Sequence, residues 1–465
     1  MSFSQKLDEV RGGFERSFWV ANVSEIFERL AYYGAFASLA NYLRESLSFP
    51  TEQTGTLTGI FGGMVWFLAI FGGAVADRLG FRRALSLAYL ILTVAYFLLG
   101  SIGATWLAPV RNLVPLSLFV GFILILPALG ISLVKPSVVG TTARASKENV
   151  RSLGYSIYYT MVNIGGAAGP LAASFAHRHL GTGKIFLIAA LAVFLMFLFV
   201  ITAFREPNKL ADTPPPSVRD VVRNFCIVLG KYKLVLPTLI LAGALWLISF
   251  LAGFRTPIWI WAVLLVIVLA GISRFMWFLV IFTGYWIVFW QQWIVMPLFL
   301  HKYVNPNLDV ELVLVTDGIV VITCTILVNY LTRKIPAFRA IILGTVITGL
   351  SWLVLAFHPS LWGAVAAIAV LAVGEIVHQP RYYEYVSRLA PPGQQGTYMG
   401  FAFLPLGIGS LVGGWFGGRV LHYFGEVQGR PERAWLVITG VGVLTAVLLF
   451  IYDRIVKPTK AEAQQ

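Results

Sequence analysis

Apolar stretches of about 18 or more residues recur along the whole chain, and they constrain the fold more than any other feature of the sequence. A helix of about 20 apolar residues crosses the hydrocarbon core of a bilayer. Only 12% of the residues are charged, whereas a soluble domain carries about 25%. The alternative, a soluble protein with unusually apolar core helices, would have too few charges to cover its surface. We therefore expect an all-α protein that spans a membrane many times.

The apolar stretches predict fourteen membrane-spanning helices, arranged as six, an inserted pair and six. We expect an N-terminal six-helix bundle in residues 1–204, a cytoplasmic linker with a two-helix hairpin in 205–273, and a C-terminal six-helix bundle in 274–465. Within the linker, residues 217–233 are amphipathic and fit either a helix on the membrane surface or a solvated helix. The predicted spans are 17–46, 54–76, 83–104, 113–139, 152–176, 183–204, 234–254, 257–273, 275–300, 311–332, 338–357, 361–388, 394–421 and 433–454.

Basic residues are concentrated in alternate loops between the predicted spans. The net charge is +14, which in a soluble protein suggests nucleic-acid binding, but here the positive-inside rule accounts for it. We therefore expect both termini in the cytoplasm, a plasma (inner) membrane location, anionic lipids rather than nucleic acid as partners, and a monomer. The polar start of the chain predicts that the first span is an uncleaved signal anchor. The even-numbered loops carry, among others, Arg78, Arg82, Arg83, Arg144, Lys147, Arg151, Arg333, Lys334 and Arg339.

The loop between the second and third spans carries glycines and charges at fixed spacing, Gly-x-x-x-Asp-Arg-x-Gly-x-Arg-Arg. It resembles the signature loop between helices 2 and 3 of the major facilitator superfamily. Glycines allow close approach of helices, an aspartate can cap or pair at a helix end, and the arginines stay in the cytosol. The alternative is an ordinary positive-inside loop. The resemblance implies a major facilitator fold whose two six-helix halves rock about a central site. The matching residues are Gly73, Asp77, Arg78, Gly80, Arg82 and Arg83.

Charged residues inside the first predicted span are the strongest indication of function. Glu25, Glu28, Arg29 and Tyr32 recur at i, i+3, i+4 and i+7, and therefore share one face of a helix. An ionised group in mid-bilayer costs at least about 2.5–3.5 kcal/mol, so such residues are functional by default. Two acids and one base leave a surplus negative charge, and we expect a proton to neutralise one carboxylate. The alternative is a structural ion-pair network that fixes helix packing.

Further charges lie in later spans. Lys135, beside Pro136, fits either a buried cation or a lysine that snorkels to the interface. Glu375 and His378 share a helix face above Pro380, and broken helices near mid-membrane often form substrate sites. His378 is expected either to titrate or, by the preferred interpretation, to be a neutral core histidine. Asp317 is one more acid, placed either in the site or near the outer interface.

Other chemistries find no support in the sequence. It contains no nucleotide-binding loop, no metal-ligand spacing among its histidines and no nucleophile–base set. Cys226 and Cys324 are far apart and suggest neither a disulfide framework nor a metal site. We therefore expect neither an enzyme nor an ATP-driven pump, and no cofactor or metal, with the proton gradient as driving force.

Together these motifs resemble the proton-dependent oligopeptide transporter family, a branch of the major facilitator superfamily. The resemblance covers nearly the whole chain, and the inserted hairpin is typical of bacterial members. It includes Glu25-x-x-Glu28-Arg29, Tyr32-Tyr33-Gly34, Lys135-Pro136, Tyr158-Tyr159 with Asn163 and Gly165, and Gly374-Glu375 with Pro380. It implies two sets of site residues. Those for proton coupling are Glu25, Glu28, Arg29, Lys135 and Glu375, and those for substrate are Arg29, Tyr33, Trp66, Lys135, Tyr159, Asn163, Gln291, Asp317, Glu375 and His378.

The sequence departs from that family at positions that face the pocket. Phe36 stands where many members have a second arginine in the first helix, and Trp290 where many have an acid in the seventh. If the two positions pair across the halves, both charges are lost together and none is left unpaired. Trp66 and Ala402 replace a tyrosine and a tryptophan, and Asp317 replaces an asparagine. The proton-handling residues are thus retained while the pocket is altered.

The sequence is compatible with three functions. The first is a proton-coupled symporter that imports short peptides or related zwitterionic or carboxylate-bearing solutes by alternating access. The second is a major facilitator antiporter that exports drugs or metabolites with the same protons. The third, a membrane receptor or scaffold that does not transport, gains nothing from costly buried charges.

Overall fold

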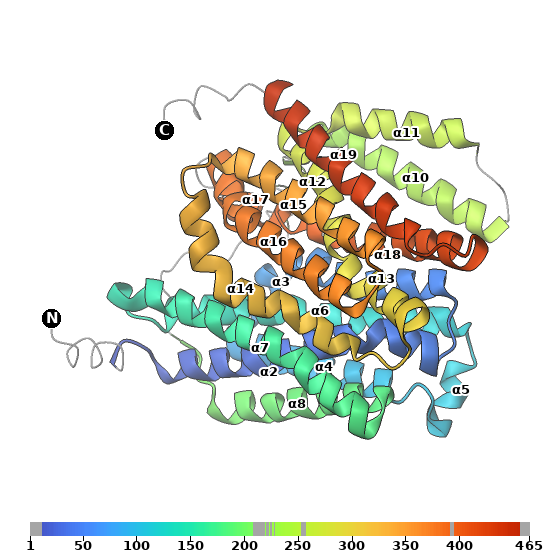
Figure 1. The fold of residues 1–465 in the computed structure, drawn as a ribbon. Coiled ribbons are helices and arrows are strands. Elements are labelled where there is room, and N and C mark those ends of the chain that lie inside the picture. The colour runs from blue at the N-terminus through green and yellow to red at the C-terminus, as the bar shows by residue number, and fades with distance from the viewer. Residues whose placement is uncertain are drawn as a thin grey trace.

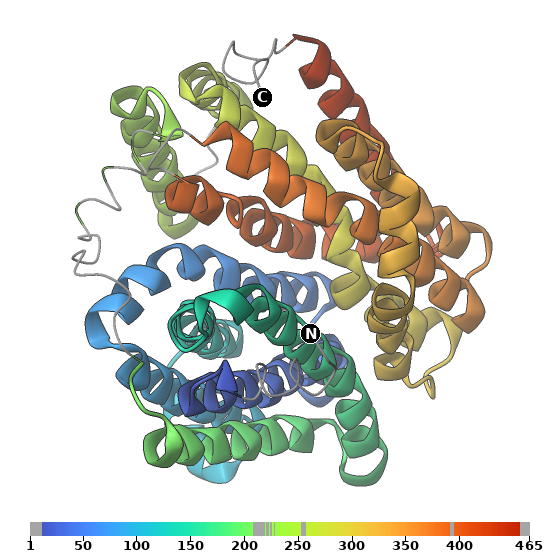
Figure 2. The same ribbon diagram turned by 90° about the vertical axis from the view of Figure 1, so that its left-hand side faces the viewer.

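The computed structural model describes residues 12–207, the single positions 219, 223 and 226, and residues 228–252, 257–390 and 395–455. Nearly all of them are helical, and Figure 1 shows the helices running roughly alongside one another. In Figure 2 the blue-to-green helices form one bundle and the yellow-to-red helices another. Of the predicted amphipathic segment, residues 217–233, eight of the seventeen residues lie outside the described residues.

The first bundle contains six long helices, separated by short turns. Its helices resemble the predicted spans to within a few residues at most ends. They are α2 (Arg16–Asn41), α3 (Thr51–Leu79), α4 (Phe81–Gly100), α6 (Leu116–Arg144), α7 (Arg151–Leu180) and α8 (Thr182–Ala203), with α5 (Ala108–Arg111) as a short turn before α6. The apolar hairpin helices α10 (Tyr232–Ala252) and α11 (Ile258–Gly271) follow.

The second bundle contains two spans that are broken rather than continuous. The predicted span 275–300 is divided at Trp290 into α12 (Arg274–Phe289) and α13 (Gln291–Phe299). The predicted span 394–421 is divided into α17 (Gln395–Phe401) and α18 (Leu404–Leu421), with Pro405 in the first turn of α18, where a missing backbone N–H costs little. The unbroken helices are α14 (Val310–Thr332), α15 (Ala337–Phe357), α16 (Leu361–Leu389) and α19 (Arg433–Ile455).

Nine helical stretches of the described chain are long and apolar enough to cross a membrane. The helices α2, α3 and α7 are not among the nine, and α2 carries Glu25, Glu28 and Arg29 within its length. All three nevertheless pack inside the first bundle against apolar neighbours. Their polar side chains face other helices, as expected for membrane helices that carry function.

The two bundles touch along α3 and α18, where glycines bring the helix backbones together. A Cβ added to Gly55 would lie 2.6 Å from the carbonyl oxygen of Gly414, and one added to Gly59 would lie 2.6 Å from that of Ser410. Small residues allow this approach, which larger side chains would prevent. The two halves can therefore pack with the backbones of α3 and α18 in close contact.

Polar side chains join the bundles at the end where α2 finishes and α3 begins, which we call the sealed end. Asp309 accepts hydrogen bonds from Ser174, at 2.5 Å, and from Arg178, at 2.6 Å. Glu311, which is fully buried, accepts one from Ser38 at 2.8 Å and lies 3.1 Å from the ring nitrogen of His177. These contacts connect α2 and α7 to the start of α14 and hold this end closed.

Candidate transport site

The charged face of α2 forms a compact buried cluster. The guanidinium of Arg29 lies 3.4 Å from a carboxylate oxygen of Glu25 and 2.5 Å from one of Glu28. All three side chains are at most 1% exposed. Both oxygens of Glu25 and one of Glu28 have no hydrogen-bond partner in the described chain. Two carboxylates therefore share one guanidinium, which leaves acceptor sites for a proton.

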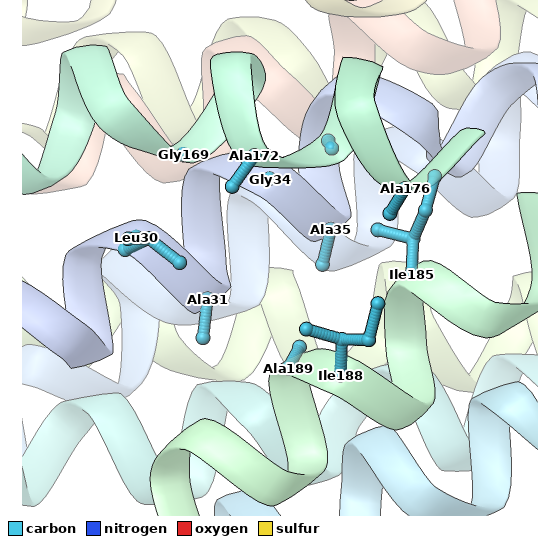
Figure 3. A pocket seen from close by; sticks show the side chains of 11 residues that line it. Leu30, Ala31, Gly34, Ala35, Gly169, Ala172, Ala176, Ile185, Ile188 and Ala189 are labelled. Carbon is cyan, nitrogen blue, oxygen red and sulfur yellow. The ribbon is translucent and has the colours of Figure 1, made fainter. Parts of the chain in front are cut away.

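Close packing of α2 on α7 positions this cluster. A Cβ on Gly34 would lie 2.9 Å from the carbonyl oxygen of Gly169, and one on Gly165 would lie 2.6 Å from the Cβ of Arg29. Figure 3 shows the small residues Gly34, Ala31 and Gly169 around an apolar void of about 20 Å³. A space of this size holds at most about one water molecule. The void is therefore a packing feature and not a solute site.

Lys135 joins the cluster from α6. Its ammonium lies 3.8 Å from the centre of the Trp66 ring on α3, a distance suited to a cation–π interaction. Its charge interacts with those of Arg29, Glu25 and Glu28. The side chain thus turns towards a neighbouring helix of the first bundle, and this direction differs from that of a snorkelling lysine.

The second bundle contributes two carboxylates, Asp317 on α14 and Glu375 on α16. The two helices are neighbours, and the charges of the two acids interact. One oxygen of each acid is buried without a hydrogen-bond partner in the described chain. Both acids also interact electrostatically with the hydroxyl of Tyr33 on α2. The acids of the second bundle therefore lie across the interface from the α2 cluster.

Aromatic rings from both bundles line the space between these groups. The rings of Trp66 and Phe403 stack with centroids 5.6 Å apart, and those of Tyr33 and Trp293 are also 5.6 Å apart. Asn163 donates a hydrogen bond to the carbonyl of Tyr159. Tyr159, whose hydroxyl interacts with the charge of Glu375, is 56% exposed. We call the space between these groups the cleft; Tyr159 is an exposed residue beside it, on the half of α7 farther from the sealed end.

Phe36 closes the cleft towards the sealed end. Its ring stacks on Trp293 with centroids 5.2 Å apart and contacts Trp290 at 5.6 Å. The two positions at which the sequence departs from a charge pair, Phe36 and Trp290, therefore meet across the bundles as an aromatic contact. All three rings are buried. We call these three residues the aromatic seal.

Gln291 and His378, two of the residues predicted to bind substrate, are not brought to the cleft. The amide of Gln291 donates to the carbonyl oxygens of Ile287 and Gly413, and its side chain fills the glycine face of α18. The ring of His378 lies 3.2 Å from the carbonyl oxygen of Gly374 and 4.1 Å from the ring centre of Tyr285. Both are buried in the core of the second bundle.

The glycine and arginine loop adopts the turn that its sequence suggests. Gly80, at a φ of +80°, separates α3 from α4, a conformation that favours glycine. Gly73 lies within α3, as do Asp77, whose side chain is outside the described part of the chain, and Arg78, which is exposed. Arg82 and Arg83 begin the exposed face of α4.

Glu206, which the sequence did not single out, caps α4. Its carboxylate accepts hydrogen bonds from the backbone N–H groups of Phe81 and Arg82, both at 2.8 Å. An acid at a helix N-terminus satisfies free N–H groups and favours the helix dipole. Because it follows α8, it ties the loop to a helix that is distant in sequence.

Other missed residues lie beside the cleft. Gln292 is fully buried, and neither its amide nitrogen nor its amide oxygen has a hydrogen-bond partner in the described chain. Tyr383 on α16 interacts with the charge of Glu375, and its ring lies 6.2 Å from that of Phe403. A glutamine in an apolar span was the signal available for Gln292. For Tyr383, no signal separates it from other aromatic residues of α16.

Residues 23–282 and 278–465 match the family model of the Major Facilitator Superfamily. The chain belongs to that family, which is a family of transporters rather than of enzymes, and it is a multi-pass membrane protein. Its fold is the all-α major facilitator fold. It resembles an auto-inhibited POT family peptide transporter with a TM-score of 0.77 at 19% identity, over 96% of this chain and 98% of that one.

Curated relatives fall into two groups. The multidrug resistance protein MdtH of Aeromonas salmonicida is 26% identical over 170 residues, which is 36% of this chain and 43% of that protein. A di-/tripeptide transporter of Lactococcus lactis is 27% identical over 219 residues, 44% of this chain and 41% of that protein. The chain thus aligns with about two fifths of the length of each.

Proposed function

We propose that the chain is a proton-coupled symporter that imports small zwitterionic or carboxylate-bearing solutes, short peptides included, by alternating access. One observation carries the proposal. The buried group of Glu25, Glu28 and Arg29 lies on one side of the cleft, and Asp317 and Glu375 lie on the other. A zwitterion placed between them would hold its carboxylate near cations of the first bundle and its amine near acids of the second. Each end would then pull the bundles together.

In this mechanism the protons bind to the carboxylates of the α2 cluster, Glu25 and Glu28. Because two carboxylates compete for Arg29, adding a proton to one of them frees the guanidinium to bind the carboxylate of the solute. Lys135 is the second cation available to that carboxylate. Residues 1–204 and 274–465 are the two rocking halves, and both termini and the end of the cleft opposite the sealed end face the cytoplasm of a plasma (inner) membrane, in agreement with the positive-inside loops.

Uptake into liposomes tests this function. The purified chain is reconstituted and given an inward proton gradient with labelled dipeptides, amino acids or organic anions outside. Glu28→Gln should abolish accumulation against the gradient of the solute and leave counterflow exchange intact. Glu148→Gln, the same change at an exposed loop position, is the matched control. Proton-driven accumulation by Glu28→Gln at the wild-type rate would refute the assignment of Glu28.

Proton-coupled export of drugs or metabolites is the second candidate, and the similarity to MdtH favours it. The aromatic walls made by Trp66, Phe403 and Trp293 would suit such cargo. The same liposomes separate the two functions. A symporter accumulates solute when protons flow inward with it, and an antiporter accumulates it only when the liposome interior is acidic.

A further inference from the structure

The cleft contains more negative than positive charge. Four carboxylates, on Glu25, Glu28, Asp317 and Glu375, face two cations, on Arg29 and Lys135. Arg29 is already engaged by the two acids of its own helix. The ion pairs of the described chain include neither Asp317 nor Glu375. The acids of the second bundle therefore lack a cation there.

Asp317 and Glu375 are placed to act on one group. They project from neighbouring helices, their charges interact, and Oδ1 of Asp317 and Oε2 of Glu375 are both buried and unpartnered within the described chain. Two like charges held close together are costly unless a proton or a cation neutralises one of them, and a cation with several donors can serve both carboxylates. An ammonium offers three N–H donors and a guanidinium five. A single α-amino group satisfies one carboxylate well and leaves the other without a counterion.

The surroundings of the two acids suit a flexible cationic chain. The hydroxyls of Tyr33, Tyr159 and Tyr383 interact electrostatically with the charge of Glu375, and that of Tyr33 also interacts with the charge of Asp317. Aromatic faces attract ammonium and guanidinium groups and pack against the methylene groups that carry them. The side chain of a basic residue has this combination of methylene groups and a charged head.

We propose that Asp317 and Glu375 form a two-carboxylate subsite that selects small solutes with a carboxylate and two cationic nitrogens, such as a dipeptide that contains lysine or arginine. This inference rests on the proposed function, because it assigns the amine end of that same cleft. Lys135 and the α2 cluster take the carboxylate, Glu375 takes the α-amino group, and Asp317 takes the second cation. A charge-assisted hydrogen bond gives about a tenfold to hundredfold preference over a dipeptide without that cation.

Direct uptake of two labelled dipeptides tests the subsite. Alanyl-lysine carries the second amine, and alanyl-alanine lacks it. Wild-type liposomes under an inward proton gradient should show a KM for alanyl-lysine about tenfold to hundredfold below that for alanyl-alanine. Asp317→Asn keeps the shape but removes the charge, so it should raise the KM for alanyl-lysine far more than the KM for alanyl-alanine and bring the ratio of the two KM values close to one. Asp453→Asn, at an exposed position of α19, is the matched control.

The outcomes separate this inference from the proposed function. Uptake of both dipeptides with equal KM by the wild type overturns the subsite and leaves the symporter intact. An equal loss for both dipeptides in Asp317→Asn also overturns the subsite, because it shows a structural role. Failure of the wild type to accumulate either dipeptide, or any other solute, under either direction of the gradient overturns the proposed function and the subsite with it.

Discussion

Replacing Phe36 with alanine should favour opening of the sealed end, in addition to the stability that loss of any buried ring costs. Phe36 contacts Trp290 and Trp293 across the two bundles, whereas its contacts with Phe61 and Tyr32 stay within the first bundle. Contacts within one bundle are present in every state of a rocking transporter and do not bias its equilibrium. The two contacts across the bundles contribute about 0.5–1.5 kcal/mol each. Their loss should therefore favour opening of the sealed end by about 1–3 kcal/mol, or about 5- to 150-fold.

Pulsed electron–electron double resonance measures this change in the population of the open state directly. Spin labels at Asn112 and His358 report on the sealed end, because both positions are exposed and lie in loops of different bundles at that end. Cys226 and Cys324, the two cysteines of the chain, are first replaced by serine. In the parent protein a short distance should dominate. In Phe36→Ala a longer distance should appear, with its population increased by the factor given above.

Phe186→Ala is the matched control for the aromatic seal. Phe186 is also fully buried, but its ring contacts Tyr42 within the first bundle. The control should lower thermal stability without lengthening the distance between the labels. An unchanged distance distribution in Phe36→Ala would refute the reasoning, and so would an equal lengthening in Phe186→Ala.

Two further predictions concern contacts between the bundles. Burial raises the pKa of the Asp309 carboxyl, but hydrogen bonds from Ser174 and Arg178 outweigh it and hold that pKa below its usual range. The contribution of this carboxylate is lost only as the pH falls through the lowered pKa. Because the charge of Asp309 also acts on His177, the test uses a His177→Gln background, in which Asp309→Asn should open the sealed end equally at about pH 5.5 and 7.5. Because Arg178 is 59% exposed, its ion pair with Asp309 contributes only about 0.2–1 kcal/mol; a pH-dependent effect on the spin-label distance would contradict this. Gly59→Leu should abolish uptake, because a Cβ at this position would lie 2.6 Å from a backbone oxygen of α18. Gly440→Leu is the control and should transport normally, because a Cβ at Gly440 has no atom within 4 Å. Wild-type uptake by Gly59→Leu would show that the close contact of α3 with α18 is not needed.

Much of the fold follows from span length alone, because a membrane helix satisfies its own backbone and its apolar residues mark where it runs. The charged face of α2 was also predictable, since Glu25, Glu28 and Arg29 need only helical spacing to meet. The break before α18 was not predicted, although Pro405 indicates a helix start. Apolar residues continue across such a break, so hydropathy alone does not reveal that the helix is divided there.

The roles of Gln291 and His378 show where this reasoning ends. A polar residue in a span is functional by default, but Gln291 donates to a carbonyl of the neighbouring helix α18, and the ring of His378 lies against the carbonyl of Gly374 in its own helix. Helical spacing identifies which residues share a face, and it does not identify which neighbour that face meets. Glu206 presents the same difficulty, because its partners on α4 lie more than a hundred residues earlier in the chain.

The aromatic seal limits where protons can act. Phe36 and Trp290 hold no titratable group, and Asp309 stays ionised because its pKa is lowered. The contact of His177 with Glu311 is titratable but lies at the sealed end, away from Tyr33 and the cleft. A proton that is to change how solute is held must therefore bind the central carboxylates. For this chain, we accordingly expect the binding of solute to be a step that is sensitive to protons, while closure of the sealed end depends on the packing of rings together with the polar contacts of Asp309 and Glu311.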